Sequence, residues 1–157
     1  MAKKEIRKEL KVSAIENGTV IDHVPSKSVY QVIRILNLLD YDNLLLIGIN
    51  LDSQKMGKKG IIKVRNKFFK PAEINKIALV APTATLIVIR DFDVAEKKQV
   101  SVPDKVEEIV KCFNPNCITN NEEMPTFFRV INKKEEDLKL RCRYCEKITA
   151  KDTMEFF

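Results

Sequence analysis

The cysteines constrain this chain more than any other residue type. All four occur as two close pairs, Cys112 with Cys117 and Cys142 with Cys145, and no cysteine lies elsewhere in the sequence. Two or four intervening residues let a tight turn aim both sulfurs of a pair at one point. The spacing therefore predicts one four-thiolate metal site per chain. A closed site of this kind holds structure rather than performing chemistry, and that role favours Zn²⁺ over iron.

Two disulfides, or four unrelated buried thiols, are the competing interpretations of the same cysteines. The chain begins with charged residues and has no apolar signal segment. An oxidising compartment is therefore not indicated, and we expect a cytoplasmic location. A redox pair at Cys142 and Cys145 would follow a strand and open a helix, whereas the surrounding residues favour strands. The metal site is the preferred interpretation.

Charge is unevenly distributed along the 157 residues. Residues 1–103 hold 18 Lys and Arg against 11 Asp and Glu, a net charge of +7, whereas residues 104–157 hold 10 against 11, a net charge of −1. A polyanionic ligand is therefore expected on the N-terminal part. No stretch approaches 18 consecutive apolar residues, so we expect a globular protein that has no membrane partner.

The hydrophobic pattern of residues 1–102 predicts one domain with the order strand, helix, strand, strand, helix, strand, followed by an edge strand. This order is typical of an α+β fold of the ferredoxin-like type, in which an antiparallel sheet carries two helices on one face. Helices are expected at 26–39 and 71–80, and residues 50–60 are expected to form a polar, basic loop. We expect strands at 10–15, 19–24, 44–49, 61–65, 85–90 and 94–102.

Residues 103–157 predict a second, small all-β domain of the zinc-ribbon type. Strands are expected at 126–131 and 138–141, joined by a charged turn. About 50 residues cannot supply a sufficient hydrophobic core, so the metal is expected to replace part of it.

No set of residues suggests catalysis. The single histidine, His23, has no nucleophile in its motif, and neither a Walker loop nor a dinucleotide-binding glycine motif is present. Binding is better supported, because Asp22 and His23 precede a predicted helix whose positive end favours phosphate. The alternative is a surface histidine without a function. Basic residues that could face a phosphorylated ligand, or else only keep a surface soluble, are Lys58, Lys59, Lys63, Lys97 and Lys98.

Several segments in both predicted domains share a resemblance to one known family. They are residues 18–25, 48–51, 56–59, 62–63 and 81–85, the spacing of Cys112 and Cys117, and residues 142–147. Together they resemble the regulatory chain of aspartate carbamoyltransferase over essentially residues 10–148. The resemblance implies an N-terminal domain that binds nucleoside triphosphates and a C-terminal zinc domain that docks on the catalytic chain. It implies that the chain itself is not an enzyme.

The resemblance also implies particular partners and contacts. Regulatory dimers, joined sheet to sheet, would bridge catalytic trimers in pyrimidine biosynthesis, with CTP inhibiting, ATP activating at the same site, and UTP as a further effector. Asp22 would lie near the ribose, His23 and Lys97 would face the triphosphate, and Lys63 would contact sugar and base. The remaining implied members of the site are Lys59 as a basic neighbour and the backbone of Ser13, Ala14, Ile15, Phe92 and Val94 around the base. The best-known relatives have Glu where Ser13 stands and Tyr where Phe92 stands. Backbone contacts would survive both differences, whereas the resemblance does not fix the nucleotide preference.

Two other classes of function are compatible with parts of the pattern. A zinc-ribbon adaptor would bind nucleic acid with strong salt dependence, but the acidic balance of the cysteine-bearing part disfavours it, so no nucleic-acid partner is expected. A small enzyme with a nucleotide substrate would turn that nucleotide over in isolation.

Overall fold

The structure is a computed structural model that describes residues 14–157. The chain forms two compact units that divide between Val100 and Ser101, called here the N-terminal unit and the C-terminal unit. Of the strand predicted at 10–15, the first four residues, including Ser13, lie outside the described residues, and Ala14 and Ile15 do not lie in a strand. Within the described range no helix is long and apolar enough to cross a membrane.

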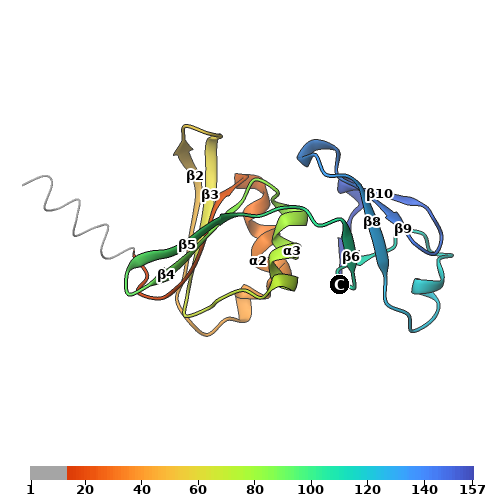
Figure 1. Ribbon diagram of the computed structural model, residues 1–157, viewed down its shortest axis with the longest axis horizontal. Coiled ribbons are helices and arrows are strands. Elements are labelled where there is room, and N and C mark those ends of the chain that lie inside the picture. Colours follow the sequence, from red (N-terminus) through yellow and green to blue (C-terminus); the bar gives the residue numbers. More distant parts are fainter. Residues whose placement is uncertain (1–13) are drawn as a thin grey trace, which may run out of the picture. The chain divides into compact units, whose positions relative to one another are not determined.

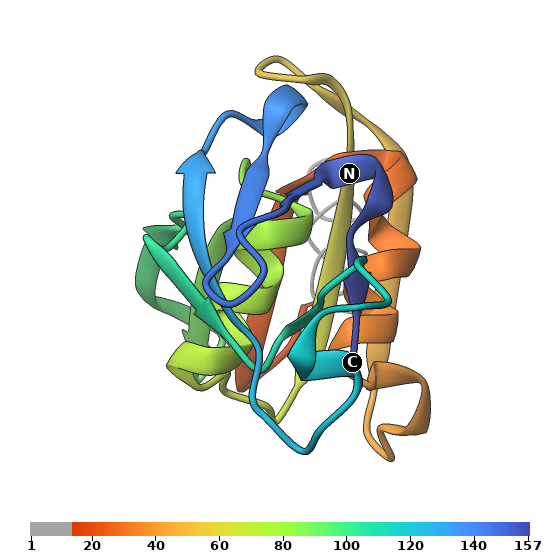
Figure 2. The same cartoon turned by 90° about the vertical axis from the view of Figure 1, so that its right-hand side faces the viewer.

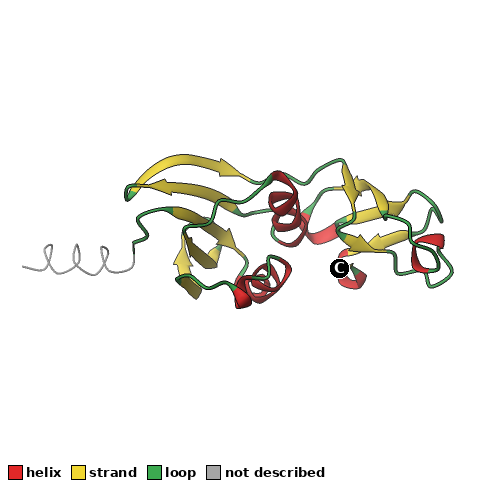
Figure 3. Cartoon of the chain, turned by 90° about the horizontal axis from the view of Figure 1, so that it is seen from below, coloured by secondary structure: helices red, strands yellow, loops and turns green. Residues whose placement is uncertain are grey.

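The N-terminal unit is a five-stranded antiparallel sheet with two helices on one face (Figures 1 and 3). In spatial order the strands are β2 (Leu45–Ser53), β3 (Gly57–Arg65), β1 (Gly18–Val24), β4 (Thr85–Arg90) and β5 (Asp93–Gln99). The helices are α2 (Val29–Ile35) and α3 (Pro71–Val80). The α+β class and the predicted order of elements are confirmed.

The helix predicted at 26–39 is shorter than expected. A 3-10 turn, η1 (Ser26–Ser28), precedes α2, and a second one, η2 (Leu38–Asp40), follows it. Asn37 adopts a left-handed conformation with φ of 53°. Asparagine tolerates this conformation at the end of a helix, so the chain turns there although the apolar positions continue the helical spacing.

The loop predicted at 50–60 is instead the tip of a hairpin formed by β2 and β3, which Figure 1 shows in yellow. Strand β2 continues to Ser53, and β3 begins at Gly57, whose φ is 77°. Asp52 and Lys58 face each other across the hairpin in an ion pair of 2.6 Å. Because these strand ends are exposed, their polar composition resembled that of a loop.

The main core of this unit lies between the sheet and the helices. Ile21 and Ile62 are fully buried, as is Ile77 on α3. Successive side chains of a strand point to opposite faces, so Val20 and Ile61 point away from the helices. On that opposite face a second apolar cluster joins Val20 to residues from three other segments, namely Ile15, Ile61, Ile87 and Ile89.

The C-terminal unit is all-β, as predicted, and is seen in teal and blue in Figure 2. Its main sheet has the order β10 (Ile148–Ala150), β9 (Lys139–Cys142), β8 (Phe127–Asn132) and β6 (Lys105–Glu107), and β7 (Val110–Lys111) pairs with β11 (Glu155–Phe156). The other elements are the 3-10 turns η3 (Ile118–Asn120), η4 (Glu135–Asp137) and η5 (Lys151–Thr153). Phe128, Leu138 and Leu140 form a small buried core.

Candidate metal centre and anion-binding face

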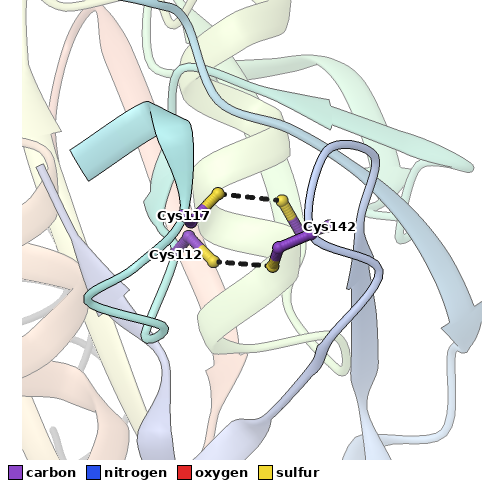
Figure 4. Close-up of side chains that lie close together, drawn as sticks. Cys112, Cys117 and Cys142 are labelled. Atoms are coloured by element: carbon purple, nitrogen blue, oxygen red, sulfur yellow. Dashed lines mark hydrogen bonds between the residues drawn. The ribbon is translucent and has the colours of Figure 1, made fainter. Parts of the chain in front are cut away.

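The structure brings the four cysteines of the C-terminal unit together. Their Sγ atoms all lie within 4.8 Å of one another, and the separations are 3.6 Å for Cys112–Cys145 and 3.7 Å for Cys117–Cys142 (Figure 4). Zn–S bonds of about 2.3 Å in a tetrahedron place sulfurs about 3.8 Å apart, whereas a disulfide needs about 2.0 Å. The four thiols are free, so the geometry fits a bound metal ion and not two disulfides.

Asparagine side chains hold the first cysteine loop in shape. The Asn120 amide donates to the carbonyl groups of Cys112, at 2.8 Å, and Asn114, at 2.7 Å. The Asn121 amide donates to the Cys117 carbonyl at 2.8 Å. These bonds fix the backbone on both sides of the loop, so both sulfurs keep their direction. These asparagines were not predicted as site residues from the sequence, although four asparagines between positions 114 and 121 are a visible signal.

Backbone bonds close the second cysteine turn at the end of β9. The Cys142 N–H donates to the Lys147 carbonyl, and the Glu146 N–H donates to the Cys142 carbonyl, both at 3.0 Å. Glu146 has a left-handed backbone with φ of 61°, which turns the chain back toward β10. The described hydrogen bonds of this turn are therefore main-chain bonds, whereas the first loop combines main-chain bonds with those of asparagine side chains.

The cluster's electrostatics also suit a cation. Burial raises the pKa of the Cys112 thiol and that of the Cys142 thiol. Burial alone would also raise the pKa of Cys145, but hydrogen bonds from the Lys147 backbone and the Asn114 side chain lower it to about 7. Buried thiols do not ionise together without a compensating charge, and a metal ion supplies that charge. The donor set therefore fits a metal held by four thiolates.

A second candidate site lies on the N-terminal unit, where β1 contains a bulge. The register of β1 against β3 shifts between Ile21 and Val24, and His23 has a φ of 55°. An extra residue in one strand redirects the side chains around it. The bulge thus brings Asp22 and His23, which would otherwise point to opposite faces, into contact with each other and with neighbouring strands.

Asp22 is held by a cation and by a backbone amide. The Lys59 ammonium lies 2.8 Å from Asp22 Oδ1, and the same oxygen accepts the His23 N–H at 2.7 Å. Burial by itself would raise the pKa of Asp22, but Lys59 and His23 outweigh it and lower the pKa below its usual value. Lys59 is therefore the ion-pair partner of this carboxylate.

Thr83, just before β4, and Thr85, its first residue, position His23, and neither was predicted from the sequence to be a site residue. His23 Nδ1 lies 3.0 Å from Thr85 Oγ1, and the Thr83 hydroxyl donates to the His23 carbonyl at 2.8 Å. Both contacts join residues at least 60 positions apart. They depend on the pairing of β1 with β4, which no local pattern displays.

Lys63 and Lys97 lie on one row of paired residues across the sheet, on either side of two apolar residues. Lys63 on β3 pairs with Val20, Val20 pairs with Ile87 on β4, and Ile87 pairs with Lys97 on β5. Paired residues point to the same face, so all four lie on the face away from the helices. This apolar strip with a cation at each end is called here the anion-binding face. It can receive a ligand that combines a flat apolar part with negative charge.

The remaining lysines of the prediction differ in position. Lys58 pairs with Asp52 at the hairpin tip. Lys98 pairs with Leu86, which is buried against the helices, so Lys98 belongs to the opposite face from Lys97. Only one of these two neighbouring lysines can therefore reach the anion-binding face.

The residues predicted to surround a base occupy two segments that touch. Ile15 is buried and Ala14 is half-buried, and the Phe92 N–H donates to the carbonyl of the adjacent Glu16 at 2.9 Å. The side chains of Phe92 and Val94 are exposed. The turn between β4 and β5 thus lies beside the segment that begins the described chain. The role of these residues in ligand binding stays a prediction.

The sequence was compared with known protein families. Residues 10–101 match the model described as the aspartate carbamoyltransferase regulatory chain, allosteric domain, and residues 104–155 match that of the same chain's metal binding domain. Curated relatives named aspartate carbamoyltransferase regulatory chain include one from Thermococcus sibiricus, 56% identical over 89% of this chain and 91% of its own length. Another, from Bacteroides thetaiotaomicron, is 52% identical over 91% of this chain and 92% of its own.

Proposed function

The chain belongs to the family of aspartate carbamoyltransferase regulatory chains, and we propose that it carries nucleotide control to the catalytic chain through a zinc-held domain. As a regulatory chain it is a non-catalytic subunit whose partner is a catalytic chain. Residues 1–102 form the proposed nucleotide-binding domain. Residues 103–157 form the proposed zinc domain that docks on the partner.

The anion-binding face is the single observation that carries the nucleotide part of the proposal. A nucleoside triphosphate combines a flat base with a strongly anionic tail, and the face combines an apolar strip with terminal lysines. In this arrangement His23 and Lys97 bind the triphosphate, and Lys63 contacts the sugar and base. Asp22, kept ionised by Lys59, accepts a hydrogen bond from a ribose hydroxyl.

Zn²⁺, one per chain, is the proposed metal. Four thiolates at tetrahedral spacing leave no open coordination position, which is characteristic of structural zinc. Bound there, the ion would join the loop after β7 to the turn after β9 and so hold the two halves of the C-terminal unit together. Its function would be to keep a docking surface in shape.

A second copy of the chain is the proposed partner at the β2 edge of the sheet. Ile47, Ile49 and Leu51 on this edge strand are 46%, 51% and 38% exposed. The opposite edge, β5, is instead rich in charged residues. Unpaired apolar edges invite strand pairing, whereas charged edges resist it. Regulatory dimers would therefore join β2 to β2.

In this proposal, a nucleotide regulates the catalytic chain because it binds two quaternary states of the complex with unequal affinity. A nucleotide that binds one quaternary state of the complex more tightly than the other shifts the equilibrium of the catalytic partner toward that state. CTP, as an end product of pyrimidine biosynthesis, inhibits, and ATP activates by competing for the same face. UTP binds there as a further effector.

The test combines this chain, loaded with zinc, with purified aspartate carbamoyltransferase catalytic trimers of the same source. A larger complex should form, as measured by analytical ultracentrifugation, and CTP and ATP should shift its aspartate saturation curve in opposite directions. If no complex forms in the presence of zinc, the regulatory proposal fails. If a complex forms but neither nucleotide changes the curve, the nucleotide part alone fails.

A further inference from the structure

Three basic residues form a row across the main sheet of the C-terminal unit. Lys105 on β6 pairs with Arg129 on β8, and Arg129 pairs with Arg141 on β9. All three are exposed. Side chains directly opposite each other on neighbouring strands have their Cβ atoms about 5 Å apart. This set is called here the basic row.

The basic row lines a hollow of about 440 Å³. The hollow is also lined by Phe127, by Glu146 and by Arg143, whose guanidinium lies 5.0 Å from the centre of the Phe127 ring. Within residues 14–157 no member of the basic row forms a salt bridge. The salt bridges of this unit instead use Lys111, Lys133 and Lys139. Glu146 is the acidic side chain in the lining of this hollow, so basic side chains outnumber acidic ones there.

Like charges directly opposite on neighbouring strands destabilise a sheet. A row of three such residues lowers the stability of the isolated unit, and an anionic partner would remove that penalty. The unit as a whole carries a net charge of −1 over residues 104–157. The members of the basic row and Arg143 nevertheless line one hollow, which the net charge does not reveal.

We propose that the basic row is the contact through which this chain binds carboxylate side chains on the surface of the catalytic chain. This inference rests on the proposed docking function. Arginine presents a planar fork that matches a carboxylate, and two arginines stand side by side here. Glu146 in the same hollow repels a continuous phosphate backbone but can pair with a basic residue. A protein surface of mixed charge fits this lining better than nucleic acid does.

The test replaces Arg141→Glu in the full-length, zinc-loaded chain and measures its affinity for catalytic trimers at several salt concentrations. Association should weaken about tenfold or more, and its salt dependence should decrease, because an attractive pair becomes repulsive. The thermal midpoint of the chain alone should not fall, since the new carboxylate faces Arg129 on the neighbouring strand. A general folding defect would lower the midpoint as well as the affinity.

A matched control is Lys55→Glu, which makes the same change in net charge at the exposed β2–β3 tip. It should leave association unchanged. If Arg141→Glu binds as tightly as the wild type, the row is not the contact and the docking proposal stands. If the wild type itself forms no complex, both proposals fall. If the wild type instead binds a single-stranded oligonucleotide and Arg141→Glu abolishes that binding, the row serves nucleic acid and the inference is overturned.

Discussion

The two units of this chain position their candidate sites by different means. On the N-terminal unit, the residues proposed to face the nucleotide stand on paired strands above an apolar layer, so strand register places them. On the C-terminal unit, Cys142 ends β9 and the other three cysteines lie outside the strands, in turns whose shape depends on asparagine amides and a left-handed residue. The first site should persist without its ligand, whereas the second should depend on its metal.

The largest expected difference between the units concerns removal of zinc. Chelation, or Cys142→Ala, should unfold the C-terminal unit and abolish association with catalytic trimers, because structural zinc contributes roughly 10 kcal/mol or more to folding. The N-terminal unit should keep its fold and its CTP affinity. Nuclear magnetic resonance spectra of both units, recorded with a CTP titration, check this. Readdition of zinc to the chelated wild type should restore docking, and an intact complex after chelation would contradict the metal's role.

Asn120→Ala probes the same dependence on a smaller scale. The side chain satisfies two backbone carbonyl groups of the first cysteine loop, and losing both bonds should cost about 2 kcal/mol. Zinc affinity should fall by at least tenfold in a competition with a chromogenic chelator, with nucleotide binding unaffected. Asn116→Ala is the control, because no hydrogen bond of its side chain stabilises the cysteine loop among the described contacts. Equal zinc affinity in both variants would contradict the proposed support.

Features set by neighbouring residues in the sequence were predictable, whereas features set by long-range strand pairing were not. Cysteine spacing is local, so all four metal-site cysteines were identified from the sequence. The alternation of strands and the helical spacing are local as well, and they predicted the order of elements. The bulge at Asp22 and His23 and the partnership of His23 with Thr85 were not predictable, because they depend on strand pairing.

The structure differs from the sequence prediction at two other places where the local pattern is not decisive. The helix end at Asn37 depends on a backbone conformation that several residues tolerate, and the β2–β3 tip has the composition of a loop because both its faces are exposed. Net charge along the sequence predicted a polyanionic ligand on the N-terminal part only. Net charge does not show that Lys105, Arg129 and Arg141 meet on one row.

Lys97→Ala tests whether strand register places the nucleotide site. Loss of a charge-assisted contact to the triphosphate should weaken CTP binding by about tenfold or more, corresponding to about 1.5 to 3 kcal/mol. Lys98→Ala is the matched control, since this neighbour belongs to the other face of β5, and its affinity should equal that of the wild type. Isothermal titration calorimetry measures both. If the two variants bind CTP equally well, the anion-binding face does not hold the triphosphate.

The smallest expected effect concerns the stability of the N-terminal unit at low pH. Burial would raise the pKa of Asp22, but Lys59 and His23 lower it below the ordinary value near 3.9. The folded unit therefore binds a proton less readily than the unfolded chain. The stabilisation that ionised Asp22 gives to this unit is complete above about pH 4 and is lost as the pH falls through the folded pKa of Asp22.

Asp22→Asn should consequently lower the stability of the N-terminal unit at pH 7 by about 1 kcal/mol or less, and by little at pH 3. Amide signals of β1 and β4 followed through a urea titration report this unit alone, so loss of the metal in acid does not affect the measurement. Asp52→Asn is the control, because its ion pair with Lys58 is solvent-exposed and should contribute almost nothing. An equal loss of stability at both pH values would mean that Asp22 stabilises the bulge through hydrogen-bond geometry rather than through its charge. The N-terminal site would then depend on local backbone shape, as the C-terminal site does.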